Sequence, residues 1–339
     1  MAGSSNFITF FVVSISVCVK QHLCVEYPVG LDCKIMHPVK ELSREEFLKY
    51  GKLKDVEHLR KAVENILIPR VAGTSGHTRV RNYISGSLHQ MGWSVQYDAF
   101  YATVHILSNV HFHNVIAKLN PKAKRFLVLT CHYDSQYSKS NTLLGALDAV
   151  PCAMLLNMAR VLQAALEPFR KTELSLMFIF FDGREPPENR NVDNFPYGAC
   201  HLANLWREDG TLNKLDILVA LDMIGSAGTT FKSSFANTEA WFSRFIALEE
   251  RWSDANKLGC TNPRRYFETE LIRSRDFKRD HMPFLQQNVP ILHLTPKIHP
   301  PVWHTKEDNG SIIDHDATDD ISRIIRLFIM EYLHSGINK

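Results

Sequence analysis

A buried strand that ends in a cluster of charged residues constrains this chain more than any other stretch. Residues 174–181 are almost continuously apolar, and polar residues follow abruptly from Asp182 onward. Such a run is typical of a strand buried on both faces, as in the parallel sheets of α/β proteins. Ligands of open α/β sheets bind beyond the carboxyl ends of these strands. Asp182, Arg184 and Glu185 are therefore candidates for a functional site, although a solvated turn would explain them equally well if they stood alone.

Further apolar runs and amphipathic segments alternate along the chain and predict its fold class. We expect strands at residues 95–100, 110–119, 126–132, 216–224 and 289–294, and helices at residues 59–67, 80–91, 150–166, 239–257 and 321–333. This alternation favours a three-layer α/β/α sandwich around a mostly parallel or mixed sheet. Because no Pro/Gly/Ser-rich or charged linker divides the middle of the chain, we expect a single domain over residues 24–339.

Composition and charge exclude some classes of partner. The chain has 339 residues, of which 45% are hydrophobic and 22% charged, with a formal net charge of +3. This composition is ordinary for a globular protein, and the charge is too small to favour nucleic acid or an anionic membrane as a partner. We expect a monomer without a stable membrane partner.

The N-terminus indicates export. Residues 7–19 form an apolar run that is too short to span a bilayer comfortably and fits the core of a secretory signal peptide. We expect this peptide to cover residues 1–23 of a secreted protein; an uncleaved anchor in the Golgi membrane is the alternative. Export would favour disulfides among the seven cysteines. Cys131, at the end of a predicted strand, and Cys152, at the start of the next helix, stand out as one pair, with two buried thiols as the alternative.

Side chains that bind metals recur where the predicted core strands end or in the loops that follow them. They are His132 and Asp134, Asp148, Glu185, Asp222, Asp280 and His281, and Trp303 and His304. Any one of them alone would be explained as a polar group with its hydrogen bonds satisfied. Together, acids and imidazoles at one edge of a sheet suit a divalent metal, most naturally zinc with oxygen and nitrogen ligands.

A series of motifs resembles those of the glutaminyl-peptide cyclotransferases, or glutaminyl cyclases. In chain order they include Cys131-His-Tyr-Asp-Ser, Gly145-Ala-Leu-Asp-Ala-Val-Pro-Cys, Phe180-Phe-Asp-Gly, Leu221-Asp-Met-Ile-Gly, Asp280-His-Met-Pro-Phe-Leu and Val302-Trp-His-Thr. The resemblance implies the fold of the related zinc aminopeptidases. It also implies the cyclisation of an N-terminal glutamine of peptides or proteins to pyroglutamate, with release of ammonia.

The same resemblance implies roles for individual residues. It implies one zinc ion bound by Asp148, Glu185 and His304. Asp222 and Asp280 correspond to acids that hydrogen-bond around the reacting amide.

Other positions correspond to supporting parts of the family's site. Trp303 matches an aromatic wall of the substrate pocket, and Cys131 and Cys152 match a disulfide. His132 and Asp134 would support the site without binding the zinc, although in two-metal aminopeptidases the same motif binds metal.

The chain also departs from the family pattern near the predicted zinc ligands. The family has Asp-Gly-Glu-Glu, in which the first Glu moves protons, but this chain has Arg184 at that position. Arginine keeps its proton and cannot act as a base, and loss of such a group costs on the order of 10²–10⁴ in rate. The chain is one residue short after Asp148 and lacks the family's Trp after Glu185. A catalytically impaired secreted relative that binds peptide N-termini is therefore the main alternative, and a two-metal zinc aminopeptidase is a third.

Overall fold

The computed structural model describes residues 37–104, 108–138, 143–185, 196–255, 264–271 and 279–336. All of them belong to one unit of the chain, Cys33–Lys339. The predicted signal peptide, residues 1–23, lies outside the described residues and stays a prediction, as does the domain boundary at residue 24. Residues 186–195, the segment in which the family has its Trp, also lie outside them.

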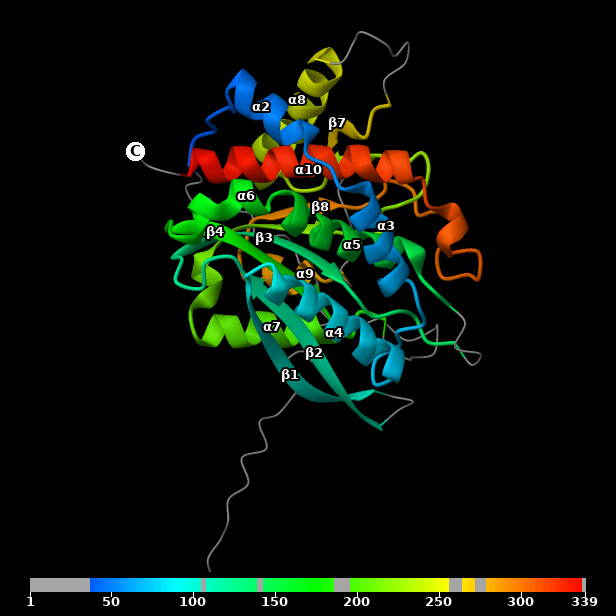
Figure 1. Cartoon of the computed structure of the whole chain (residues 1–339). Helices are drawn as coiled ribbons and strands as arrows, with labels where there is room; N and C mark the ends of the chain where they lie inside the picture. The colour runs from blue at the N-terminus through cyan, green and yellow to red at the C-terminus, as the bar shows by residue number, and fades with distance from the viewer. Residues whose placement is uncertain are drawn as a thin grey trace, which may run out of the picture. The chain divides into compact units, whose positions relative to one another are not determined.

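The centre of the fold is a mixed six-stranded sheet with the strand order β1-β2-β4-β3-β5-β8 (Figure 1). Its strands are β1 (Ser94–Val104), β2 (Ser108–Lys118), β3 (Arg125–His132), β4 (Leu174–Phe181), β5 (Leu215–Leu221) and β8 (Ile291–Leu294). The last four are parallel to their neighbours among themselves, whereas β2 is antiparallel to both β1 and β4. The predicted mixed sheet is confirmed.

The strand β4 is central, as its apolar sequence predicted. It pairs with β2 on one edge and with β3 on the other, and every one of its residues is buried. Its side chains alternate between the two faces of the sheet, as the pleat of a strand requires. Leu176, Phe178 and Phe180 join one hydrophobic core, and Met177 and Ile179 join the core on the other face.

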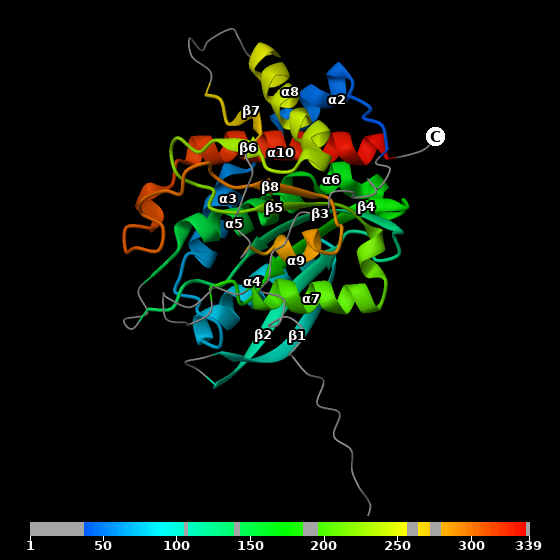
Figure 2. The ribbon, with the colours of Figure 1, turned by 180° about the vertical axis from the view of Figure 1, so that it is seen from behind.

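Helices cover both faces and complete the three layers (Figures 1 and 2). The first core contains side chains of α2 (Arg44–Lys52), α3 (Val56–Ile66), α4 (Ser75–Gln90), α5 (Ala146–Val161), α8 (Glu239–Ala255) and α10 (His315–Ser335). The second contains side chains of α7 (Tyr197–Glu208) and α9 (Met282–Leu285). The short helix α6 (Gln163–Leu166) follows α5. The described residues also form the 3₁₀ turns η1 (Glu167–Arg170), η2 (Thr211–Lys214), η3 (Ala236–Thr238) and η4 (Gly310–Ile312).

Two features were not predicted from the sequence. The helix α7 buries Ala199, Leu202, Ala203 and Trp206, and their helical spacing in the sequence is the signal that indicates it. A second, two-stranded parallel sheet pairs β6 (Phe231–Ser233) with β7 (Phe267–Leu271). Strands this short leave little periodic signal.

Among the described helices, no single one is long and apolar enough to cross a membrane. One pair, Ala146–Val161 with Gln163–Arg170, reaches that length and hydrophobicity jointly, but it is bent by 70°. Within this pair, α5 buries nearly all of its residues, so its apolar side chains are accounted for by packing in the core.

Candidate active site

The carboxyl ends of β3, β4 and β5 meet at one edge of the sheet because these strands are parallel neighbours. His132 ends β3, Glu185 lies shortly after β4, and Asp222 directly follows β5. Asp148 arrives from α5, the helix after β3, as an acidic residue of its first turn. The predicted convergence of these residues at one rim is therefore observed.

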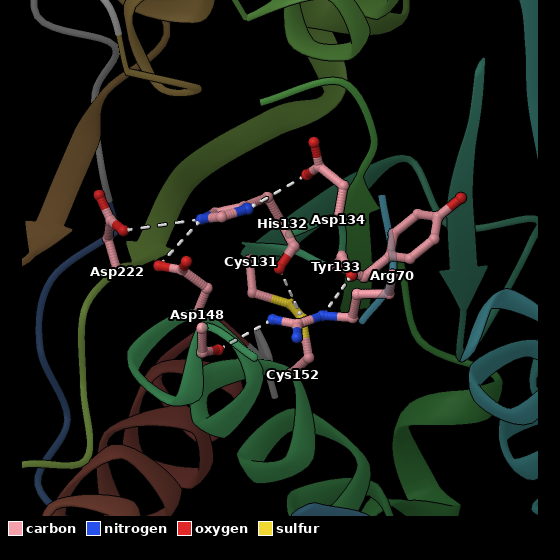
Figure 3. The surroundings of a disulfide bond; sticks show 9 residues. Arg70, Cys131, His132, Tyr133, Asp134, Asp148, Cys152 and Asp222 are labelled. Carbon is pink, nitrogen blue, oxygen red and sulfur yellow. Dashed lines mark hydrogen bonds and ion pairs between the residues drawn. A yellow bond between two sulfur atoms is a disulfide. The ribbon is translucent and has the colours of Figure 1, made fainter. Parts of the chain in front are cut away.

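His132 is the centre of a buried group of ligand-type atoms (Figure 3). Its Nε2 lies 3.4 Å from Asp148 Oδ1 and 4.0 Å from Asp222 Oδ1, while its Nδ1 lies 3.2 Å from Asp134 Oδ1. One ligand atom each of His132, Asp148 and Asp222 lies within 4.8 Å of the others. Burial lowers the pKa of His132, but Asp148 and Asp134 outweigh it and raise the pKa well above 6.5. This buried group is a possible metal site.

Glu185 and His304 form a second group. Glu185 Oε2 lies 3.2 Å from His304 Nε2, and Glu185 Oε1 lies 3.4 Å from Arg184 Nη1. Burial raises the pKa of Glu185, but Arg184 and His304 act more strongly together and lower it. The Glu185 backbone N–H donates to Asp134 Oδ2 at 2.7 Å, so Asp134 connects this pair to the group around His132.

The three predicted zinc ligands are thus divided between two connected groups. The structure brings Glu185 and His304 together and places Asp148 beside His132. Across the described residues, the group of three whose ligand atoms all lie within 4.8 Å of one another is His132, Asp148 and Asp222 rather than the predicted set.

Buried polar atoms without a hydrogen-bond partner occur on the predicted zinc ligands and on several of their neighbours, among them Asp222 and Asp280. Asp148 Oδ1, Glu185 Oε2 and His304 Nε2 are buried and have no hydrogen-bond partner among the described residues. Such atoms cost free energy unless something pairs with them. Two oxygens and one imidazole nitrogen are suitable zinc donors, and zinc ligands about 2.0–2.1 Å from the ion lie roughly 3.3 Å apart in a tetrahedron. The spacing of Glu185 and His304 fits that chemistry.

The backbone at the site is strained. His304 has a φ of +61° and Met223, which follows Asp222, has a φ of +52°. Left-handed conformations of residues other than glycine cost about 1–3 kcal/mol and concentrate at functional sites. Here they occur at His304 and directly after Asp222.

Asp222 and Asp280 lie in contrasting surroundings. Asp222 Oδ2 accepts a hydrogen bond from Arg279 Nη1 at 2.6 Å. Burial raises the pKa of Asp222, but Arg279 and His293 reverse this and hold it well below 3.8. Burial raises the pKa of Asp280 to about 7, although His132 and Arg184 oppose the shift. Asp222 is therefore held ionised, whereas Asp280 can gain or lose a proton near neutral pH.

Trp303 packs beside His304. Its ring centroid is 3.8 Å from that of His304, and the Arg279 guanidinium lies 5.2 Å from its centroid. Arg279 was not identified from the sequence. Its partner Asp222 lies 57 residues earlier in the chain, so the sequence around Arg279 did not indicate the pairing.

The disulfide between Cys131 and Cys152 is confirmed, with 5.7 Å between the Cα atoms. It joins the end of β3, one residue before His132, to α5, one turn after Asp148 (Figure 3). The covalent bond therefore connects the two elements that carry neighbouring residues of the site.

Comparisons with known proteins identify the family of this chain. The model of peptidase family M28 matches residues 114–329. The glutaminyl-peptide cyclotransferase of Drosophila melanogaster is 48% identical over 312 residues, which cover 89% of this chain and 88% of that protein.

Solved structures are similar to this chain as well. The glutaminyl cyclase of Macrostomum lignano has a TM-score of 0.81 and 31% identity, and the match covers 88% of this chain and 95% of that one. A zinc-dependent exopeptidase from Parabacteroides distasonis shares the fold at a TM-score of 0.63 and 20% identity, covering 81% of this chain and 97% of its own. The chain belongs to the glutaminyl-peptide cyclotransferase family and has an M28 peptidase-related fold.

Proposed function

We propose that this protein is a zinc-dependent glutaminyl-peptide cyclotransferase that converts an N-terminal glutamine of peptides or proteins to pyroglutamate and releases ammonia. The 48% identity to the Drosophila enzyme over most of both chains supports the activity. The structural observation that carries the proposal is the set of buried, unpaired atoms on Asp148, Glu185 and His304. These three residues would hold one zinc ion. When bound, zinc would supply a Lewis acid for the side-chain carbonyl of the substrate.

The remaining chemistry needs positioning and one proton carrier. The α-amine of the substrate attacks its own side-chain amide carbon, so the nucleophile is already tethered to the reacting group. A C–N bond forms as the ring closes, and the C–N bond to the amide nitrogen breaks. The proton lost by the amine must reach the departing nitrogen, which leaves as ammonia.

Asp280 is the group we assign to that proton transfer. Arg184 occupies the position of the family's base and cannot accept a proton. Asp280 Oδ1 is buried and lacks a hydrogen-bond partner within the described part of the chain. With a pKa raised to about 7 by burial, Asp280 can accept the amine proton and return it to the leaving group near neutral pH.

Asp222 and Trp303 bind and orient the substrate in this proposal. Asp222 stays ionised beside Arg279, so it can accept hydrogen bonds from the substrate amide. Trp303 provides the apolar wall next to His304, against which the methylene groups of the glutamine side chain can pack.

The test is turnover of a peptide that begins with glutamine. We expect the purified protein to release ammonia and to form the pyroglutamyl peptide. Turnover should cease after dialysis against a chelator and should return when zinc is added back. Absence of turnover above background at high enzyme concentration would contradict the proposed activity. Two equivalents of zinc per chain with release of free N-terminal residues would instead indicate an aminopeptidase.

A second candidate function is binding of peptide N-termini without turnover. Arg184 favours it, because its buried guanidinium lies 3.4 Å from Glu185 and places a positive charge beside a predicted zinc ligand. Measured binding of a glutamine-initiated peptide with no ammonia release would support this candidate.

We also propose that the protein is exported and acts as a monomer. The disulfide is compatible with the oxidising secretory pathway. Expression of the full chain in animal cells should place it in the medium with a shortened N-terminus. Retention in the Golgi would support an uncleaved anchor, and gel filtration would report the oligomeric state.

A further inference from the structure

Arg70 is a buried cation that does not take part in the proposed chemistry. Its side chain is inaccessible to solvent and donates to backbone carbonyls on two separate segments. Nε donates to the Tyr133 carbonyl at 2.8 Å, just after β3 (Figure 3). Nη2 donates to the Gly145 carbonyl at 3.0 Å. Nη1 also donates to the Leu144 carbonyl. One side chain therefore ties the end of β3 to the two residues that precede α5.

Asp308 holds the same turn with its backbone and its side chain. Its Oδ1 accepts the Leu147 N–H at 3.0 Å, and its backbone carbonyl lies 3.3 Å from the Ala146 nitrogen, which donates to it. A helix leaves its first backbone N–H groups without partners, and a capping side chain normally supplies them. Gly145, the N-cap residue of α5, has no side chain and makes no such bond.

Gly145 is needed at this N-cap for space as well as for conformation. Its φ of +58° lies in the left-handed region, and a Cβ built there would lie 3.1 Å from Asp148 Oδ2. A capping side chain at this position would therefore crowd Asp148. The first turn of α5 is instead held by two distant residues, and both are buried.

We propose that Arg70 and Asp308 are positioning residues that set the place of Asp148 relative to the other predicted zinc ligands. Asp308 lies four residues after His304, so its contacts tie the segment that carries His304 to the turn that carries Asp148. Arg70 ties the same turn to the end of β3, next to His132. This arrangement holds Asp148 in a chain that is one residue short after it. The inference rests on the proposed zinc site.

The experiment measures the zinc affinity of folded variants by competition with a chelating dye, with thermal unfolding recorded in parallel. Arg70→Met removes the carbonyl contacts and Asp308→Ala removes the cap. Asp308→Asn keeps an oxygen where Oδ1 accepts the Leu147 N–H. Arg170→Met is the matched control, because Arg170 likewise donates to two backbone carbonyls, those of Met91 and Gly92, but outside the site.

We expect Arg70→Met and Asp308→Ala to weaken zinc binding by about 10–100-fold, as removal of groups that orient metal ligands does. Asp308→Asn should retain most of the affinity. Arg170→Met should lower the unfolding temperature without changing zinc affinity. A merely structural role would move only the unfolding temperature.

Equal zinc affinity in wild type and folded Asp308→Ala would overturn the inference and leave the proposed function intact. If Arg70→Met does not fold, the contrast between Asp308→Ala and Asp308→Asn decides the matter. Failure of the wild-type protein to bind zinc is a distinguishable result, seen before any variant is made. It would overturn the proposed function and this inference together.

Discussion

Two acids that follow the same strand, Asp182 and Glu185, have opposite surroundings. Both are buried, with exposures of 0% and 2%. Asp182 accepts hydrogen bonds from the His113 N–H at 2.7 Å and the Gly183 N–H at 2.8 Å, and lies 2.9 Å from His77 Nε2. Glu185 Oε2, in contrast, faces His304 Nε2 with no hydrogen-bond partner in the described residues. Asp182 therefore fastens the fold together, and Glu185 is available to a ligand.

The contrast shows that charge and burial at a strand end do not by themselves mark a functional residue. The partners of Asp182 come from α4, β2 and the segment after β3, and they satisfy both of its oxygens. A satisfied carboxylate stabilises the structure, and an unsatisfied one costs free energy that a metal can offset. Four predictions test this distinction and are given from the largest expected effect to the smallest.

Glu185→Ala should abolish zinc binding and turnover while leaving the protein folded. The change removes one of three proposed ligands, but it also removes the carboxylate beside the buried Arg184 guanidinium, so the free energy of unfolding of the metal-free protein should fall by about 1–3 kcal/mol. Elemental analysis, the glutamine-peptide assay and denaturant unfolding check this. Zinc retained at one equivalent would contradict the ligand role.

Arg184→Glu should raise turnover, by on the order of 10², because it supplies a base next to the site and removes a cation from Glu185. The initial rate of ammonia release, measured on the zinc-loaded protein, reports this. Arg184→Gln, which removes the charge without supplying a base, is the matched control and should gain much less. No gain in either variant would mean that other differences limit the rate.

Asp182→Ala should destabilise the fold by at least about 3 kcal/mol, because it leaves several buried donors unpaired at about 1–3 kcal/mol each. Zinc affinity of the protein that remains folded should stay unchanged. Asp182→Asn keeps one acceptor oxygen and should lose less. Urea unfolding followed by circular dichroism measures the difference, and a loss of zinc with no loss of stability would reverse the assignments of Asp182 and Glu185.

Asp280 gives a third case, an acid whose proton can move. Burial raises the pKa of Asp280 to about 7, so its basic form is present above that pH and is lost as the pH falls through it. Because Asp280 and the substrate amine must both be unprotonated, we expect kcat/KM to fall about tenfold per pH unit between about 8 and 7 and about a hundredfold per pH unit below about 7. The substrate amine titrates near about 7.7–8.0. In Asp280→Asn, the residual kcat/KM should therefore depend on the amine alone and fall about tenfold per pH unit below that range. An unchanged profile in that variant would exclude Asp280 as the proton carrier.

Much of the fold could be predicted from the sequence because periodicity reports which face of an element is buried. The buried strand β4, the amphipathic helix α10 and the convergence of Asp148 with His132 followed from apolar patterns and from strands that end at one edge. The short strands β6 and β7 did not, because three to five residues carry little pattern.

The sequence could not predict which polar side chains of the site have hydrogen-bond partners and which do not. The partners of Asp182 and the contacts of Arg70 and Asp308 are hydrogen bonds between residues far apart in the chain. Every residue type has a backbone carbonyl, so the sequence does not show which carbonyls accept these hydrogen bonds. The sequence therefore indicated which acids lie at the sheet edge, and only the three-dimensional arrangement shows which of them are satisfied.

The most direct test is anomalous diffraction at the zinc edge from crystals of the zinc-loaded protein. The account predicts one peak per chain, in contact with Asp148, Glu185 and His304. A peak enclosed by His132, Asp148 and Asp222 without Glu185 or His304, or two peaks in one chain, would contradict it.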